Sequence, residues 1–119
     1  MIDTKIVVNW NTMPHWQRTT FVHLSKATGL LRARLNGETM FIGCAAKGNL
    51  GARLRSYRSP NGTGRKHHAG QQIYNNLMNI EMQIAQLDLS PYEIEEVLNY
   101  MIRKYNPPWN VPNGRRRIR

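Results

Sequence analysis

The sequence predicts an α+β domain in which helices flank a small three-stranded antiparallel sheet. Three observations predict it: an alternating segment that turns at Asn36-Gly37, a second alternating segment over residues 79–87, and a helix start at Ser90. An Asn-Gly pair favours a type I′ hairpin turn because both central positions need positive φ. Alternation with a period of two is typical of a half-buried strand. At 119 residues the chain has the length of one domain with one modest core.

Residues 1–28 are expected to form an N-terminal arm. Ile6, Val7 and Val8 predict a short strand, and residues 9–14 predict a loop. Three large apolar residues of the arm are expected to cap the core from a short helix or an irregular segment: Trp16, Phe21 and Leu24. The main domain then covers residues 29–112, and a basic flexible tail covers residues 113–119.

Residues 29–43 are expected to form the β-hairpin. In its first strand the apolar side chains of Leu31, Ala33 and Leu35 face the core. Arg32 and Arg34 lie on the opposite face, as contacts to a nucleic-acid backbone or as solvent residues. The second strand covers residues 40–42, and Gly43 ends it.

A helix is expected to begin near Gly48 or Asn49, and Asn49 is a good N-cap residue. Leu50 and Leu54 lie four residues apart and should face the sheet. Arg53 and Tyr57 share a second helix face at the same spacing. The sequence alone leaves this pair open between an ordinary solvated pair and a phosphate-binding pair.

Residues 59–70 predict a loop because Pro60 and three glycines interrupt any regular element. A short helical turn is expected over residues 71–77. The second half of the loop is basic and contains His67 and His68. Adjacent histidines point to different sides and no cysteine joins them, so phosphate contact is a better interpretation than metal binding.

The last strand and the last helix are the most regular segments. Ile80, Met82 and Ile84 place one face of the strand over residues 79–87 on the core. Ser90 and Glu93 have the spacing of a capping box with Pro91 at the first helical position. The helix is expected to run to about Tyr105, with an apolar stripe formed by Ile94, Val97, Leu98, Met101, Ile102 and Tyr105.

The chain carries 17 Lys and Arg against 7 Asp and Glu, a formal net charge of +10. This balance predicts a polyanionic partner, most often nucleic acid. The sequence shows no basic amphipathic helix and no apolar run of about 18 residues, so no membrane partner is expected. The single cysteine, Cys44, excludes an internal disulfide and favours a cytoplasmic, reducing location. It is expected to be a small buried thiol rather than a reactive one.

The order of these elements resembles the GIY-YIG nuclease superfamily over about residues 29–110. Gly29-Leu30-Leu31 stands where the family has its GIY triplet, and Phe41-Ile42-Gly43 stands where it has YIG. Arg53 matches the arginine of the family's helix, and Tyr57 matches the position four residues later. Asn110 matches the asparagine that ends the family's last motif.

The resemblance implies hydrolysis of a phosphodiester with a divalent metal held by one glutamate of the last helix. Arg53 would stabilise the phosphate, and Tyr57 would donate to it or help proton transfer. Asn110 would hydrogen-bond to the site or lock the chain end. Mg²⁺ or Mn²⁺ would be the cofactor of an active enzyme, and no cofactor is expected otherwise.

Three positions that match the family's site are apolar in this sequence. Leu31 and Phe41 lack the hydroxyls of the two triplet tyrosines, and Leu98 stands at the metal glutamate. We therefore expect that Leu31, Phe41 and Leu98 fill the former cleft. Glu95, one helical turn before Leu98, is the substitute metal ligand if the protein is active.

Three functions remain. The leading one is a DNA-binding protein with a degenerate catalytic site. Its phosphate contacts are expected at Arg53, Arg55, Arg58, Arg65, Lys66, His67 and His68. The alternatives are an active endonuclease that uses Glu95, and a protein-binding inhibitor or accessory factor on a retired nuclease fold. By analogy, such a protein suits phage or mobile-element biology; the sequence leaves open DNA against RNA and the oligomeric state.

Overall fold

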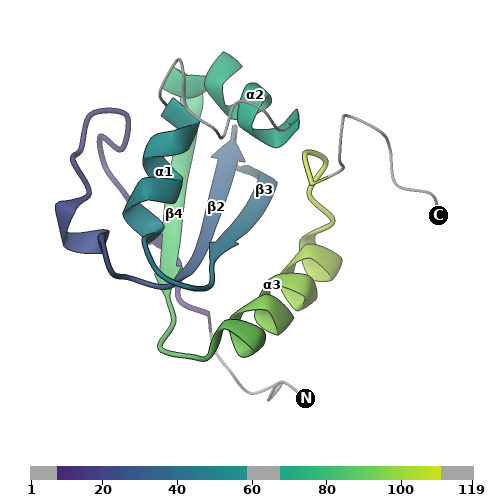
Figure 1. Cartoon of the computed structure of the whole chain (residues 1–119). Helices are drawn as coiled ribbons and strands as arrows, with labels where there is room; N and C mark the ends of the chain where they lie inside the picture. The colour runs from purple at the N-terminus through teal and green to yellow at the C-terminus, as the bar shows by residue number, and fades with distance from the viewer. Residues whose placement is uncertain (1–7, 59–67, 111–119) are drawn as a thin grey trace.

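The computed structural model describes residues 8–58 and 68–110. The predicted α+β class is confirmed, with an antiparallel sheet between helices (Figure 1). The prediction of three strands is wrong, because the sheet has four in the order β1-β4-β2-β3. The strands are β1 (Asn11–Thr12), β2 (Gly29–Leu35), β3 (Glu38–Ala45) and β4 (Ile80–Gln86).

The additional strand, β1, comes from the segment that was expected to be a loop. It pairs with β4 through Asn11 opposite Ile84 and Thr12 opposite Gln83. Two polar residues carry no alternation that could predict a strand, and their partners lie far along the chain. The strand expected over Ile6–Val8 falls mostly outside the described residues, and Val8 itself is not in a strand.

The central hairpin has the predicted turn, with φ of 53° at Asn36 and 82° at Gly37. The prediction that Gly43 ends the second strand is wrong, because the ladder continues to Ala45 opposite Gly29. Gly29 has φ of 151°, and a Cβ there would lie 2.1 Å from the Ala85 carbonyl oxygen. Only glycine therefore fits where β2 passes β4 at this point.

Helices α1 (Leu50–Arg58) and α2 (His68–Asn75) cover one face of the sheet (Figure 1). Asn49 is the predicted N-cap, since its Oδ1 accepts a hydrogen bond from the Ala52 amide at 3.0 Å. Helix α2 starts three residues before the helical turn expected over residues 71–77. It ends at Asn75, and a 3₁₀ turn over Leu77–Asn79 follows.

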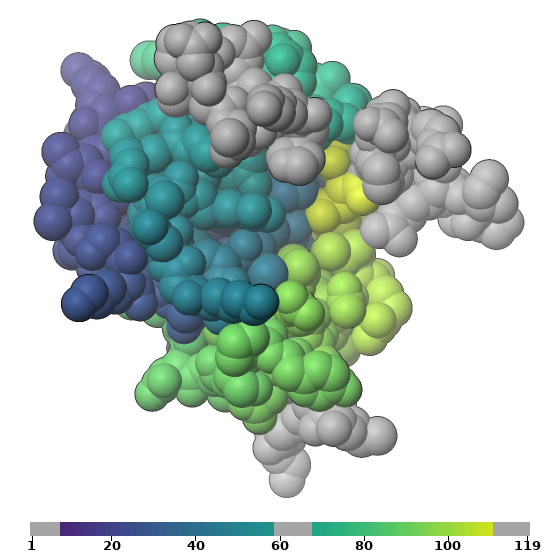
Figure 2. Space-filling model, viewed as in Figure 1, coloured from purple at the N-terminus to yellow at the C-terminus, as the bar shows by residue number. Residues whose placement is uncertain are grey.

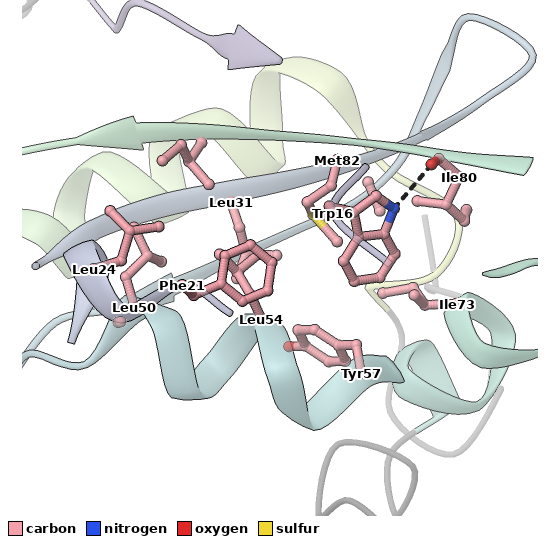
Figure 3. Close-up of a cluster of buried hydrophobic side chains, with 13 residues drawn as sticks. Trp16, Phe21, Leu24, Leu31, Leu50, Leu54, Tyr57, Ile73, Ile80 and Met82 are labelled. Atoms are coloured by element: carbon pink, nitrogen blue, oxygen red, sulfur yellow. Dashed lines mark hydrogen bonds between the residues drawn. The ribbon is translucent and has the colours of Figure 1, made fainter. Parts of the chain in front are cut away.

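The larger core cluster lies between α1, α2 and the sheet (Figure 3). Leu50 and Leu54 are fully buried and face the sheet, as predicted. The three apolar residues of the N-terminal segment, Trp16, Phe21 and Leu24, are buried there too, the last in a 3₁₀ turn over Val22–Leu24. Figure 3 shows the Trp16 indole donating to the Ile80 carbonyl, at 3.0 Å.

Helix α3 (Pro91–Tyr105) covers the other face of the sheet. It begins with the predicted capping box of Ser90 and Glu93. The second core cluster lies beneath it and consists of Leu30, Ile42, Ile94, Val97 and Met101. Because both faces of the sheet are covered, Arg32 is largely buried, and the expectation that its side chain is a solvent residue is wrong.

Within residues 8–58 and 68–110, no helix combines the length and apolar character needed to cross a bilayer.

Candidate functional site

A cleft of about 530 Å³ opens where the loop between β3 and α1 meets the first half of α3. Figure 2 shows these two parts of the chain side by side on the molecular surface. Side chains able to bind an anion or a metal come from three elements: Cys44 and Lys47 from the end of β3 and its loop, Arg53, Ser56 and Tyr57 from α1, and Glu95 from α3.

Arg53 and Tyr57 lie on adjacent turns of α1 and do not form an ordinary solvated pair. The Tyr57 ring is 2% exposed within the larger core cluster, whereas Arg53 is exposed. Burial raises the pKa of the Tyr57 hydroxyl, and the charge and hydrogen bond of Arg53 oppose that rise. The hydroxyl therefore stays protonated at neutral pH, and the charge of Arg53 acts on it.

Leu31 and Phe41 belong to the larger core cluster. Leu31 is fully buried, and the half-buried Phe41 ring meets Tyr57 edge-on with 5.9 Å between centroids. A Cβ at Gly43 would lie 2.9 Å from the Phe41 ring, so this glycine makes room for the aromatic side chain. The two positions without hydroxyls therefore support the core beneath Tyr57.

Leu98 packs against the second core cluster, on the opposite face of the sheet from Leu31 and Phe41. None of these three apolar residues lines the cleft. They extend two separate cores and do not fill the cleft between α1 and α3, which stays open.

Glu95 is the acidic residue of the cleft. It lines the cavity together with Arg53 and Tyr57, although it lies on a different element. Burial raises the pKa of the Cys44 thiol, Arg53 lowers it, and Glu95 raises it. Arg53 of α1 and Glu95 of α3 therefore act with opposite charges on the Cys44 thiol in the cleft.

A divalent metal would find one carboxylate in the lining of this cleft. Among the described residues, no three His, Cys, Asp or Glu side chains group as a metal site. Mg²⁺ is commonly held by one or two carboxylates and completes its shell with water and substrate phosphates. Glu95 and an open cavity fit such an ion, whereas the soft Cys44 sulfur does not.

Asn110 does not line the cleft. Its Oδ1 accepts from the Ile42 amide at 3.0 Å, and its Nδ2 donates to the Ile42 carbonyl at 2.9 Å. The neighbouring Trp109 amide donates to the Met40 carbonyl at 2.9 Å, and its side chain packs on the larger cluster. These contacts fit the alternative in which Asn110 locks the end of the chain.

Two of the expected phosphate contacts have partners within the protein. Arg58 donates to the Trp16 carbonyl at 2.7 Å and lies 4.7 Å from the Phe21 ring centroid, and burial lowers its pKa. Arg55 is exposed and donates to the Thr20 carbonyl at 3.3 Å.

The basic loop is described only at its end. His68 is the first residue of α2 and is half-buried. Arg65, Lys66 and His67 lie outside the described residues. Of the residues expected to contact phosphate that the structure does describe, Arg53 is the one that lines the cleft.

Lys47, Ser56 and Cys44 are cleft residues that sequence reasoning missed. Lys47 precedes Gly48, which has φ of 111°, and Asn49, the N-cap of α1. A cation and a glycine just before a helix N-cap are typical of anion sites, because free amides and the helix dipole meet there. That local pattern could have identified Lys47; Ser56 and Cys44 carry no such signal.

No protein-family model and no curated protein matches the chain. Solved structures do match. The GIY-YIG N-terminal endonuclease domain of UvrC from Thermotoga maritima, bound to magnesium as its catalytic divalent cation, superposes with a TM-score of 0.61 at 22% identity. The match covers 83% of this chain and 100% of that domain.

Two tyrosine-to-phenylalanine point mutants of the same Thermotoga maritima domain, each bound to its catalytic divalent cation, match equally well. Their TM-scores are both 0.61, at 23% and 21% identity, and each comparison covers 83% of this chain. They cover 100% and 99% of the respective domains. This chain therefore has the GIY-YIG fold of the UvrC endonuclease domain.

Proposed function

We propose that this protein binds DNA by holding a backbone phosphate in the cleft between α1 and α3. The observation that carries the proposal is the meeting of Arg53, Lys47 and the Tyr57 hydroxyl in one open cavity. The formal net charge of +10 supports a polyanionic ligand. The likeness to a domain described as an endonuclease supports a phosphodiester ligand in particular.

Arg53 is the main phosphate contact in this proposal. A guanidinium offers two parallel N–H donors that match two phosphate oxygens. Tyr57 lines the same cleft and would donate a hydrogen bond from its hydroxyl to the same phosphate. Lys47 adds a second cation from the other side of the α1 N-terminus.

The test compares Arg53→Gln with Arg18→Gln, which removes the same charge from an exposed residue outside the cleft. DNA affinity measured by fluorescence anisotropy should fall at least tenfold for Arg53→Gln and less than threefold for Arg18→Gln. Loss of one phosphate contact should also make the slope of log binding constant against log salt concentration shallower by about 0.9. Equal effects of the two variants would overturn the proposal.

Metal-dependent cleavage is the second candidate function, and the position of Glu95 in the same cleft favours it. When bound, a divalent cation would neutralise charge on the phosphate and activate water. Glu95 would hold that cation, Arg53 would orient the phosphate, and the protonated Tyr57 hydroxyl would donate a hydrogen bond. Loss of the hydroxyls at Leu31 and Phe41 leaves these three groups in place.

Nicking of supercoiled plasmid with Mg²⁺ or Mn²⁺ separates the two candidates. An active enzyme should lose at least 100-fold in rate on Glu95→Gln and keep its rate on Glu96→Gln, the neighbouring carboxylate outside the cleft lining. Absence of metal-dependent nicking in the unmodified protein, with DNA binding intact, would leave the binding function alone.

A further inference from the structure

Arg32 is a buried cation that forms no ion pair with a carboxylate among residues 8–58 and 68–110. Its side chain is 9% exposed, and its Nε donates to the Gln83 Oε1 at 2.8 Å, with Nη2 bonded to the same oxygen. The guanidinium carbon lies 4.5 Å from the centroid of the Trp10 ring and 5.4 Å from that of Tyr105. In the described part of the chain, the ion pair found joins a different arginine, Arg34, to Glu81 at 2.9 Å.

Neutral partners orient this guanidinium without cancelling its charge. Burial lowers the pKa of Arg32, which reflects the unfavourable free energy of placing a cation here. Cation–π attraction to the two aromatic rings partly offsets this cost. The Gln83 amide and the two rings hold the plane of the fork in place, which favours an anion that approaches from the remaining side.

A pocket of about 360 Å³ has Arg32 in its lining. Arg32 and Arg34 line it with Thr39 from the start of β3 and Tyr105 from the end of α3. Glu38 is the acidic residue of this lining, and it is exposed. The pocket therefore joins the Arg32 guanidinium, the Arg34 guanidinium that is already paired with Glu81, and the hydroxyl-bearing Thr39 around a cavity large enough for a phosphate.

This Arg32 pocket and the Arg53 cleft lie at opposite ends of the same two elements. Strand β3 begins at the pocket with Glu38 and ends at the cleft with Ala45, about 20 Å away. Helix α3 contributes Glu95 to the cleft and Tyr105 to the pocket, about 15 Å apart along its axis. A distance of 15–20 Å corresponds to the rise of about five base pairs of duplex DNA.

We propose that the Arg32 pocket binds a second backbone phosphate of the DNA whose first phosphate lies on Arg53. This inference rests on the proposed DNA-binding function and extends it to a two-point contact along β3 and α3. A phosphate is favoured over a protein carboxylate because β3 and α3 hold the pocket 15–20 Å from the cleft. One DNA duplex presents further backbone phosphates at that separation.

The test places an anion in the pocket without touching Arg32, because Arg32 variants would disturb the packing of Gln83 and Trp10. Thr39→Glu puts a carboxylate in the pocket lining, and Val22→Glu adds the same charge at a residue that is 71% exposed and outside both cavities. At 0.1 M salt the Debye length is about 10 Å, so a difference between the variants reports a local effect.

DNA affinity should fall at least tenfold for Thr39→Glu and less than threefold for Val22→Glu. Thr39→Glu should also raise the melting temperature, since the new carboxylate neutralises Arg32. In the unmodified protein, inorganic phosphate should shift the Arg32 Nε–Hε NMR signal saturably, and in Thr39→Glu it should not. Glu38→Gln, which removes the acid of the lining, should tighten DNA binding two- to fivefold.

Equal DNA affinities of Thr39→Glu and Val22→Glu would overturn the second site. If the Arg32 signal still responded to phosphate in that case, the pocket would serve an acidic protein side chain instead, and the DNA proposal for it would fail. Failure of the first site has a different signature, because Arg53→Gln would then match Arg18→Gln. The two proposals are therefore separable.

Discussion

The Tyr57 side chain is part of the larger core cluster and also lines the cleft. Its ring is buried against Phe41, and the charge of Arg53 acts on its hydroxyl. The same arrangement explains why Phe41 is compatible with an intact cleft: the aromatic ring packs without needing a hydroxyl of its own.

The pKa of the Cys44 thiol reports on the charges around the cleft. It can be measured selectively because Cys44 is the single cysteine of the chain. Burial raises the pKa of its thiol, Arg53 lowers it, and Glu95 raises it. The thiolate is the reactive form. Alkylation by iodoacetamide should therefore be slow at neutral pH and should still be rising above pH 9.

Two substitutions should move this pH profile in opposite directions. Glu95→Gln should shift the midpoint to lower pH, and Arg53→Gln should shift it to higher pH. Glu96→Gln is the control and should leave the midpoint unchanged. Identical midpoints in all four proteins would contradict the placement of Arg53 and Glu95 around one thiol.

The hairpin is the element with the strictest sequence requirement, and the requirement differs between its two ends. Gly29→Ala would place a Cβ 2.1 Å from the backbone of β4, whereas a Cβ at Gly37 has 3.9 Å to its nearest atom in the flexible Arg34 side chain. Gly37→Ala should cost about 1–2 kcal/mol for its positive φ. Gly29→Ala should cost more than about 3 kcal/mol, or prevent folding.

Urea denaturation followed by circular dichroism checks this pair. The two variants make the same chemical change in the same hairpin, so each is the control for the other. Equal losses of unfolding free energy would show that the approach of β4 to Gly29 is not the determining contact.

Helix α3 depends on its first turn. The Ser90 amide donates to the Glu93 carboxylate at 3.0 Å, and the Glu93 amide donates to the Ser90 hydroxyl at 3.2 Å. Hydrogen bonds from the Ser90 amide and hydroxyl lower the pKa of Glu93 below its usual 4.5. A lowered folded-state pKa stabilises the protein above the unfolded pKa, and this stabilisation is lost as the pH falls through the folded value.

The unfolding free energy should therefore decline more steeply below pH 4.5 in the unmodified protein than in Glu93→Gln. The glutamine keeps the capping geometry but does not titrate. Ser90→Ala should cost about 1 kcal/mol at neutral pH. Urea titrations between pH 3 and 7 measure both effects, with Glu96→Gln as the control; parallel curves for Glu93→Gln and the unmodified protein would refute the prediction.

At the scale of the molecule, local signals predicted the elements and non-local packing decided the rest. The Asn36-Gly37 turn and the Ser90 cap are short patterns, and both are confirmed. Strand β1 could not be predicted, because its two residues acquire their structure from β4. The burial of Arg32 depends on α3, which covers a face that the alternating pattern left polar.

The candidate site was predicted in its parts but not in its arrangement. The spacing of Arg53 and Tyr57 on one helix was visible in the sequence. The spacing that the resemblance implies, counted back from Asn110, gives Leu98 as the metal position, whereas the carboxylate in the cleft lies one turn earlier at Glu95. Such a count assumes that the chain between α3 and Asn110 takes the same course in every member of the family. The packing of α3 determines which of its turns faces α1.

Asn110 joins the end of the described chain to the edge of the sheet. Its side-chain amide hydrogen-bonds the Ile42 backbone as a neighbouring strand would. Ile42 is 1% exposed, and β3 is an edge strand of the sheet that the described residues form. Asn110→Ala should cost about 2–3 kcal/mol, because two hydrogen bonds are lost and the Ile42 amide and carbonyl lose their partner. Asn99→Ala, at an exposed position of α3, should be neutral or slightly stabilising.

Amide hydrogen exchange locates this effect in the molecule. In Asn110→Ala the Ile42 amide should exchange at least tenfold faster relative to the amides shared by β2 and β4. The freed edge of β3 should also promote association at high protein concentration, since an uncovered strand edge pairs with other chains. Unchanged relative protection of Ile42 would show that the last residues lie on the sheet without closing its edge.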